Sequence, residues 1–194
     1  MVAKRAAKIT CFAYGSNMFS SRMCAPDRVP SAKPLKAGYI KGYRLTFDKA
    51  SKRDGSGKCD AELTQNDKDR VYGVLYAVDQ SEKPELDEVE GLHRGYEEKA
   101  VDVVTANGVK TAVMYYATSE AKDPSLKPCH WYKALVVAGA VEHGLPFPYV
   151  EWLRTIESVQ DQDAARRMEH ERLLSTWQRT KGSIRTRATK VRAR

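Results

Sequence analysis

The order of strand-like and helix-like segments is the feature that most limits how this chain can fold. Segments rich in β-branched and aromatic residues are gathered in the first two thirds of the 194 residues, without the regular strand-helix alternation of a parallel sheet. Asn107-Gly108 separates the last two of these segments and is the strongest hairpin signal in the chain. This order predicts an α+β fold with a mostly antiparallel sheet. The expected strands are Ile9–Tyr14, Tyr43–Phe47, Asp60–Thr64, Val71–Val78, Lys99–Val104 and Lys110–Ala117.

Helical patterns lie between and after these strands. Ser81 is placed to cap a short helix that continues to Glu90 and stops before Gly91. Tyr132–Glu142 has apolar residues at helical spacing and ends before Gly144. Other expected features are a short helix or turn at Met18–Cys24, a flexible loop at Ser51–Lys58, and helices at Pro148–Ile156 and from Asp163 onward.

The positive charge of the chain is confined to its C-terminal part. The formal net charge is +8, from 33 Lys and Arg against 25 Asp and Glu. Residues 164–194 hold ten Lys and Arg against two Asp and Glu, which leaves 23 of each sign in residues 1–163. We therefore expect a charge-balanced domain at 1–163, followed by a basic helix and a disordered end at 164–194, with few apolar residues after Thr180.

Cysteine usage and hydropathy limit the class of protein. Cys11, Cys24, Cys59 and Cys129 form no CxxC pair, so the sequence suggests neither a zinc site nor a disulfide framework. No run of 18 apolar residues occurs, and residues 1–8 lack the apolar region of a secretion signal. The expectation is a cytoplasmic protein with reduced thiols, no membrane span and no bound metal.

The stretch Phe12-Ala13-Tyr14-Gly15-Ser16-Asn17 has the composition of a ligand-binding loop. It follows a strand directly, and a small Gly-Ser-Asn loop can turn backbone N–H groups toward one point that an oxyanion or carboxylate could occupy. A plain turn explains the same residues equally well. The loop lacks the Gly-x-x-x-x-Gly-Lys-Ser/Thr pattern of a phosphate-binding P-loop.

A second candidate is the acidic segment Leu86-Asp87-Glu88-Val89-Glu90-Gly91. Helical periodicity prevents Asp87, Glu88 and Glu90 from all facing inward. One buried carboxylate with a raised pKa would suit a general acid/base, whereas a cluster of acids more often forms a solvated helix face. From spacing alone, the solvated face is the better interpretation.

A family resemblance links these segments. The loop Tyr14-Gly15-Ser16-Asn17, the segment Leu86–Gly91 and the stretch from Tyr132-Lys133 through Gly139 to Glu142-His143-Gly144-Leu145-Pro146 resemble γ-glutamylcyclotransferases in order and separation. The likeness spans about residues 9–157. It extends to γ-glutamylamine cyclotransferases and plant avirulence-induced (AIG2-like) proteins, which share mainly the loop and the glutamate, and Glu142–Pro146 favours the first family.

The resemblance implies a fold, an activity and a set of site residues. It implies a small, mixed, mostly antiparallel β-barrel with flanking helices, often a homodimer, without metal or organic cofactor. The implied enzyme is a carbon–nitrogen lyase of glutathione metabolism that forms 5-oxoproline from a small-molecule γ-glutamyl substrate, and residues 1–163 become its catalytic domain. Glu90 matches the general acid/base, Cys11, Phe12, Ala13, Tyr14, Gly15, Ser16 and Asn17 match the pocket, Tyr132 matches a substrate-contacting tyrosine, and Tyr96 lies one residue nearer the glutamate than a further pocket tyrosine.

Histidines offer the main competing chemistry. Cys129 precedes His130, but adjacent side chains usually point apart, which disfavours a Cys-His hydrolase. We expect His143 to be structural and His170, in the polar C-terminal helix, to be solvated.

Two other functions stay open at this point. The enzyme could act on γ-glutamylamines or on glutathione. Alternatively, the chain could be a non-catalytic binding module of this fold, whose basic tail binds nucleic acid or an acidic surface. A solubilising role explains the tail equally well.

Overall fold

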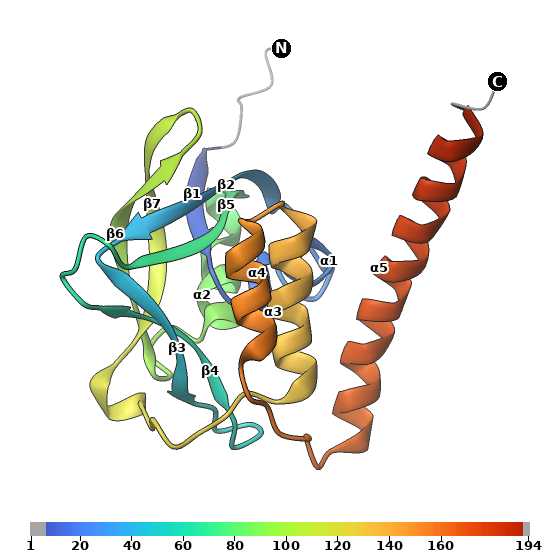
Figure 1. Cartoon of the computed structure of the whole chain (residues 1–194). Helices are drawn as coiled ribbons and strands as arrows, with labels where there is room; N and C mark the ends of the chain where they lie inside the picture. The colour runs from blue at the N-terminus through green and yellow to red at the C-terminus, as the bar shows by residue number, and fades with distance from the viewer. Residues whose placement is uncertain (1–6, 192–194) are drawn as a thin grey trace.

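Five strands form a closed barrel in the computed structural model, which describes residues 7–191, with side chains described as far as residue 179 (Figure 1). The strand order around the barrel is β1-β5-β2-β6-β7, and every pairing is antiparallel except the one between β1 and β7. The strands are β1 (Lys8–Ala13), β2 (Lys33–Lys41), β5 (Arg70–Asp79), β6 (Tyr96–Thr105) and β7 (Gly108–Ala117). The expected mixed, mostly antiparallel barrel is confirmed.

A separate two-stranded sheet, β3 (Tyr43–Ala50) with β4 (Gly57–Leu63), stands below the barrel in Figure 1. The expected strands and the β6–β7 hairpin at Asn107-Gly108 are present. Strand β2 was not predicted from the sequence. Its first half is exposed, and Pro34 adjoins a register shift between Pro34 and Lys36, so it lacks a clear alternating pattern.

The helices lie mainly on one side of the barrel and at its end, and the C-terminal half of α5 projects away from the rest (Figure 1). They are η1 (Ser16–Met18), α1 (Ser20–Met23), η2 (Gln80–Glu82), α2 (Lys83–Glu90), η3 (Ser119–Ala121), α3 (His130–Glu142), α4 (Phe147–Thr155) and α5 (Ala164–Val191). None of those within residues 7–191 is both long and apolar enough to cross a membrane.

The predicted N-cap at Ser81 is wrong. Ser81 lies inside η2, and α2 begins two residues later with Glu82 as its N-cap and no side-chain capping bond. Pro84 explains the shift, because proline suits the first turn of a helix, where its missing N–H needs no partner.

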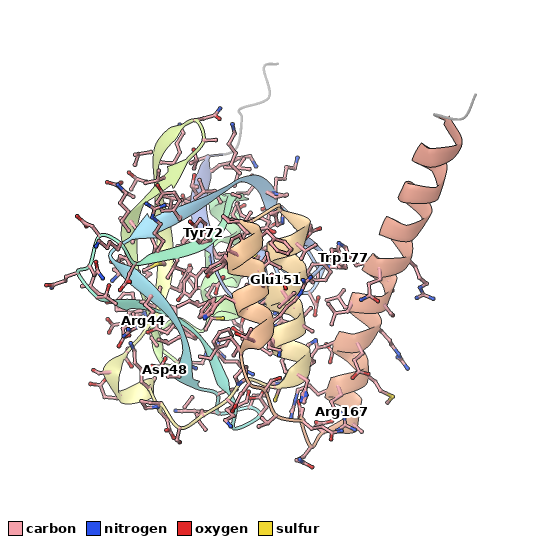
Figure 2. The ribbon with its side chains drawn as sticks, in the orientation of Figure 1. Arg44, Asp48, Tyr72, Glu151, Arg167 and Trp177 are labelled. Atoms are coloured by element: carbon pink, nitrogen blue, oxygen red, sulfur yellow. The ribbon has the colours of Figure 1, made fainter. Side chains whose placement is uncertain are left out.

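Helix α3 is the central helix of the packed side, and it is held against the loop after β1. A Cβ added at Gly139 would lie 2.6 Å from the Met18 Cβ and 2.6 Å from the Phe19 backbone nitrogen, so only glycine permits this approach. The first part of helix α5 packs against the domain through Leu173, Leu174 and Trp177, the last of which is labelled in Figure 2. The Trp177 ring contacts Phe19 edge-on, with ring centroids 5.5 Å apart. The division into 1–163 and 164–194, with a disordered end, stays a prediction.

Candidate active site

A cavity of about 790 Å³ opens where the end of β1 meets α2, α3, the β3–β4 hairpin and the start of α5. Nine of the ten residues proposed from the sequence line it: Phe12, Ala13, Tyr14, Gly15, Ser16, Asn17, Glu90, Tyr96 and Tyr132. Cys11, the tenth, is fully buried in β1 and is not part of the lining. Strand alternation points its side chain away from that of Phe12.

The loop after β1 is fixed by contacts on both sides. The Tyr14 hydroxyl donates to the Tyr115 carbonyl oxygen at 2.5 Å. A Cβ at Gly15 would lie 3.1 Å from the Tyr132 hydroxyl oxygen and 3.2 Å from the Cys59 Cβ. A side chain at this position would therefore press on Tyr132 and β4, which would have to shift by a few tenths of an ångström.

Glu90 ends α2 with its carboxylate at the cavity. Gly91 follows in the left-handed conformation, with φ of 79°, which ends the helix and keeps Glu90 in its last turn. The Asn17 side-chain amide donates to Glu90 Oε1 at 3.0 Å, and Arg28 donates to Asn17 Oδ1 at 2.7 Å. Burial raises the pKa of Glu90, while the Asn17 hydrogen bond and the charges of Arg28 and Arg22 oppose part of that rise.

The other two acids of this segment have different surroundings. Asp87 accepts a hydrogen bond from the Tyr115 hydroxyl at 2.6 Å and pairs with Lys83. Glu88 has a side chain that is 75% exposed. Glu90 is therefore the carboxylate of this segment that both lines the cavity and has a raised pKa.

Tyr96 and Tyr132 approach the cavity wall through the same residue of β4. The Tyr132 hydroxyl accepts a hydrogen bond from the Cys59 backbone N–H at 3.1 Å, and the Tyr96 hydroxyl donates to the Cys59 carbonyl oxygen at 2.8 Å. Burial raises the pKa of both phenols well above the ordinary value, so both stay neutral at physiological pH.

The histidines separate into structural and cavity residues. His143 lies within hydrogen-bond distance of Ser20 Oγ at 3.1 Å and of the Tyr76 hydroxyl at 3.3 Å, which agrees with a structural role. Cys129 is buried, whereas His130 is exposed and lies 3.3 Å from the Ser158 carbonyl oxygen. They do not form a nucleophile-base pair.

The expectation of a solvated His170 is wrong. His170 is only 5% exposed, lines the cavity and stacks on Trp131 with ring centroids 3.9 Å apart. Burial and the neighbouring cations, Arg22 first among them, lower its pKa to about 4. The start of α5 is thus a wall of the site. The sequence held a signal for this, because His170, Leu173, Leu174 and Trp177 follow one helical face.

Several cations in the lining were not predicted from the sequence. Arg22, Arg28, Lys49 and Lys58 come from α1, the following loop and the β3–β4 sheet. Lys58 pairs with Asp54 at 2.6 Å and lies 4.6 Å from the Tyr132 ring centroid. These residues belong to separate segments of the sequence and come together only in the fold. No sequence spacing could therefore predict that they share a cavity.

Two carboxylates and a thiol near the cavity lie close enough together to be considered as a metal site. Ligand atoms of Asp54, Cys129 and Asp161 lie within 4.8 Å of one another. Each of the two carboxylates already forms an ion pair with a cationic side chain. Lys58 pairs with Asp54, and Arg166 pairs with Asp161 at 2.5 Å. This donor set therefore fits a protein ion-pair network that anchors α5.

Comparisons with known proteins place this geometry in context. The model of the AIG2-like family matches residues 70–153. The chain is 33% identical over 151 residues to a human gamma-glutamylcyclotransferase, covering 75% of this chain and 77% of the relative, and 31% identical to the bovine one over the same lengths. A solved gamma-glutamyl cyclotransferase structure superposes with a TM-score of 0.73 at 29% identity, covering 81% of this chain and 92% of the other.

Proposed function

The chain belongs to the γ-glutamylcyclotransferase family, and we propose that it is the enzyme that converts γ-glutamyl amino acids to 5-oxoproline and a free amino acid, with Glu90 as general acid/base. The observation that carries the assignment of Glu90 is its place at the cavity, half-buried, with a raised pKa and an oriented carboxylate. The same position was singled out by the sequence resemblance.

The reaction needs no nucleophile from the protein. The substrate's own α-amine attacks its γ-carbonyl carbon, the new C–N bond closes a five-membered ring, and the former amide C–N bond breaks. The amine must lose a proton before attack, and the leaving amine must gain one. A single carboxylate can accept the first proton and donate it later, and this kind of catalysis is typically worth about 10² to 10⁴ in rate.

The rest of the cavity supplies positioning. Folding the substrate so that amine and carbonyl meet contributes several kcal/mol, on the order of the gains of intramolecular reactions. Hydrogen bonds hold the walls that would impose this shape. Tyr132 and Tyr96 are hydrogen-bonded to the backbone of Cys59, and Tyr14 is hydrogen-bonded to the backbone of β7. We propose that Phe12–Asn17, Tyr132 and Tyr96 form the γ-glutamyl pocket. Cys11 supports it from behind.

The test is a panel of substrates assayed for 5-oxoproline. The panel comprises γ-glutamyl amino acids, γ-glutamyl-ε-lysine and glutathione, so that the γ-glutamylamine and glutathione alternatives are compared directly. Product from the γ-glutamyl amino acids is expected. If none of the panel yields 5-oxoproline, the proposal is wrong and the binding-module alternative is favoured.

We propose a separate role for the basic end of α5 in binding nucleic acid or another acidic surface, supported by the charge excess of residues 164–194. Deleting residues 179–194 is expected to preserve turnover, because the cavity residues Arg166 and His170 precede the deletion. Salt-dependent retention on heparin should fall. Unchanged retention would remove this role. The expected homodimer and cytoplasmic location stay predictions.

A further inference from the structure

Lys49 is a largely buried cation that forms no direct ion pair with the described side chains. It lies on β3, is only 8% exposed and lines the cavity. Within residues 7–179, its ammonium has no hydrogen bond and no ion pair, and its closest specific contact is the Tyr96 ring, with Nζ 4.8 Å from the centroid. Burial, and after it the charges of Lys58 and Lys52, lower the pKa of Lys49, while the charge of Asp54 opposes part of that fall.

The Tyr96 ring does not offset the cost of this burial. A cation–π contact is weaker than an ion pair, so it leaves the partly buried ammonium without a counter-charge in contact. Uncompensated charges in a cavity wall are explained when a ligand of opposite sign completes them. The ligand group that suits Lys49 is therefore an anion.

Arg22 is a second cation of this kind. It lines the same cavity, and its Nε is buried without a hydrogen-bond partner among the described residues. Its charge favours the ionised form of Glu90, as does that of Arg28. A γ-glutamyl amino acid carries two carboxylates, and the one on the glutamyl α-carbon adjoins the amine that Glu90 must deprotonate. Arg22 suits that carboxylate.

We propose that Lys49 binds the second carboxylate, the one on the leaving amino acid, and thereby selects γ-glutamyl α-amino acids over γ-glutamylamines. This inference rests on the proposed function. The Tyr96 ring is near both ends of the site. A Cβ added at Gly91, the residue after Glu90, would lie 3.6 Å from the Tyr96 ring, and Lys49 Nζ lies over the same ring. The leaving group would then lie along Tyr96 with its carboxylate at Lys49.

A matched pair of substrates isolates this contact. γ-Glutamyl-ethylamine is γ-glutamyl-alanine without the leaving-group carboxylate. A hydrogen bond to a charged group contributes about 1.5 to 3 kcal/mol, so wild-type kcat/KM should favour the alanine substrate by about 10- to 100-fold. Lys49→Met should reduce this ratio to near one by lowering kcat/KM for γ-glutamyl-alanine alone, mainly through KM. Lys49→Arg should restore most of the preference.

The matched control is Lys99→Met. Lys99 also makes a cation–π contact with a tyrosine, with Nζ 4.3 Å from the Tyr116 ring centroid, but it does not line the cavity. The ratio of the two kcat/KM values should therefore not change in Lys99→Met. Lys49→Gln repeats the test if Lys49→Met folds poorly. Equal wild-type turnover of the two substrates, or an unchanged ratio in Lys49→Met, would overturn the role of Lys49 and leave the cyclotransferase assignment standing. Absence of 5-oxoproline from both substrates would overturn the proposed function and this inference with it.

Discussion

Asn17 connects Arg28 to Glu90, and its replacement by leucine tests whether that connection sets the working pKa of the carboxylate. Leucine has a similar volume and suits a site that is 7% exposed. The change removes the 3.0 Å hydrogen bond to Glu90 Oε1, which stabilises the ionised form. Its loss therefore raises the pKa of Glu90 further above the ordinary value.

The size of the shift follows from the strength of the bond. A hydrogen bond to a charged group is worth about 1.5 to 3 kcal/mol, and one pKa unit corresponds to about 1.36 kcal/mol, so a rise of about one to two units is expected. Glu90 must be ionised to accept the substrate's proton. The acidic limb of the pH profile of kcat/KM should therefore move to higher pH by at least about one unit.

The assay is 5-oxoproline formation between pH 5 and 9 for wild type and Asn17→Leu. Asn66→Leu, in the exposed turn before β5, serves as a matched control and should leave the profile unchanged. Thermal unfolding confirms that each variant is folded. An acidic limb that stays in place in a folded Asn17→Leu protein would refute the role given to this hydrogen bond.

Two further predictions concern the packing of the helices around the site. His170 takes up a proton near pH 6.5 when unfolded but only near about 4 when folded, so the free energy of unfolding falls as pH drops through that window. From pH 7 to 4.5 wild type should lose about 2 kcal/mol more than His170→Phe in urea unfolding, and equal losses would contradict the buried neutral histidine. Gly139→Ala forces α3 away from Met18 and should lower the free energy of unfolding by about 1 to 3 kcal/mol. An unchanged urea midpoint would show that this contact is loose.

The sequence predicted the parts of this protein that depend on local pattern. The alternating strands, the Asn107-Gly108 hairpin and the apolar spacing of α3 follow from short-range rules, and the structure confirms them. Strand β2 was not predicted, because Pro34 and an exposed first half remove the alternating pattern of a half-buried strand. The cap expected at Ser81 differs from the structure because Pro84 favours a helix that starts at Lys83.

The candidate site was predicted where one contiguous motif carries it, and missed where distant segments meet. The sequence indicated both the loop after β1 and the carboxylate of Glu90 as site candidates. Glu90 was singled out only through the family resemblance. Lys49 and Arg22 were missed, since a lysine on a strand and an arginine in a short helix resemble ordinary surface residues. His170 is buried although its helix is mostly polar, because its spacing with Leu173 and Trp177 places it on the packed face.

The central claim is that Glu90 moves the proton that cyclisation requires, and the kcat of Glu90→Gln tests it most directly. Glutamine keeps the size of the side chain and can still accept the Asn17 hydrogen bond, so the fold and thermal stability should be retained. The account predicts that turnover of a γ-glutamyl dipeptide to 5-oxoproline falls by at least about 10². Turnover near the wild-type rate by the folded variant would contradict it.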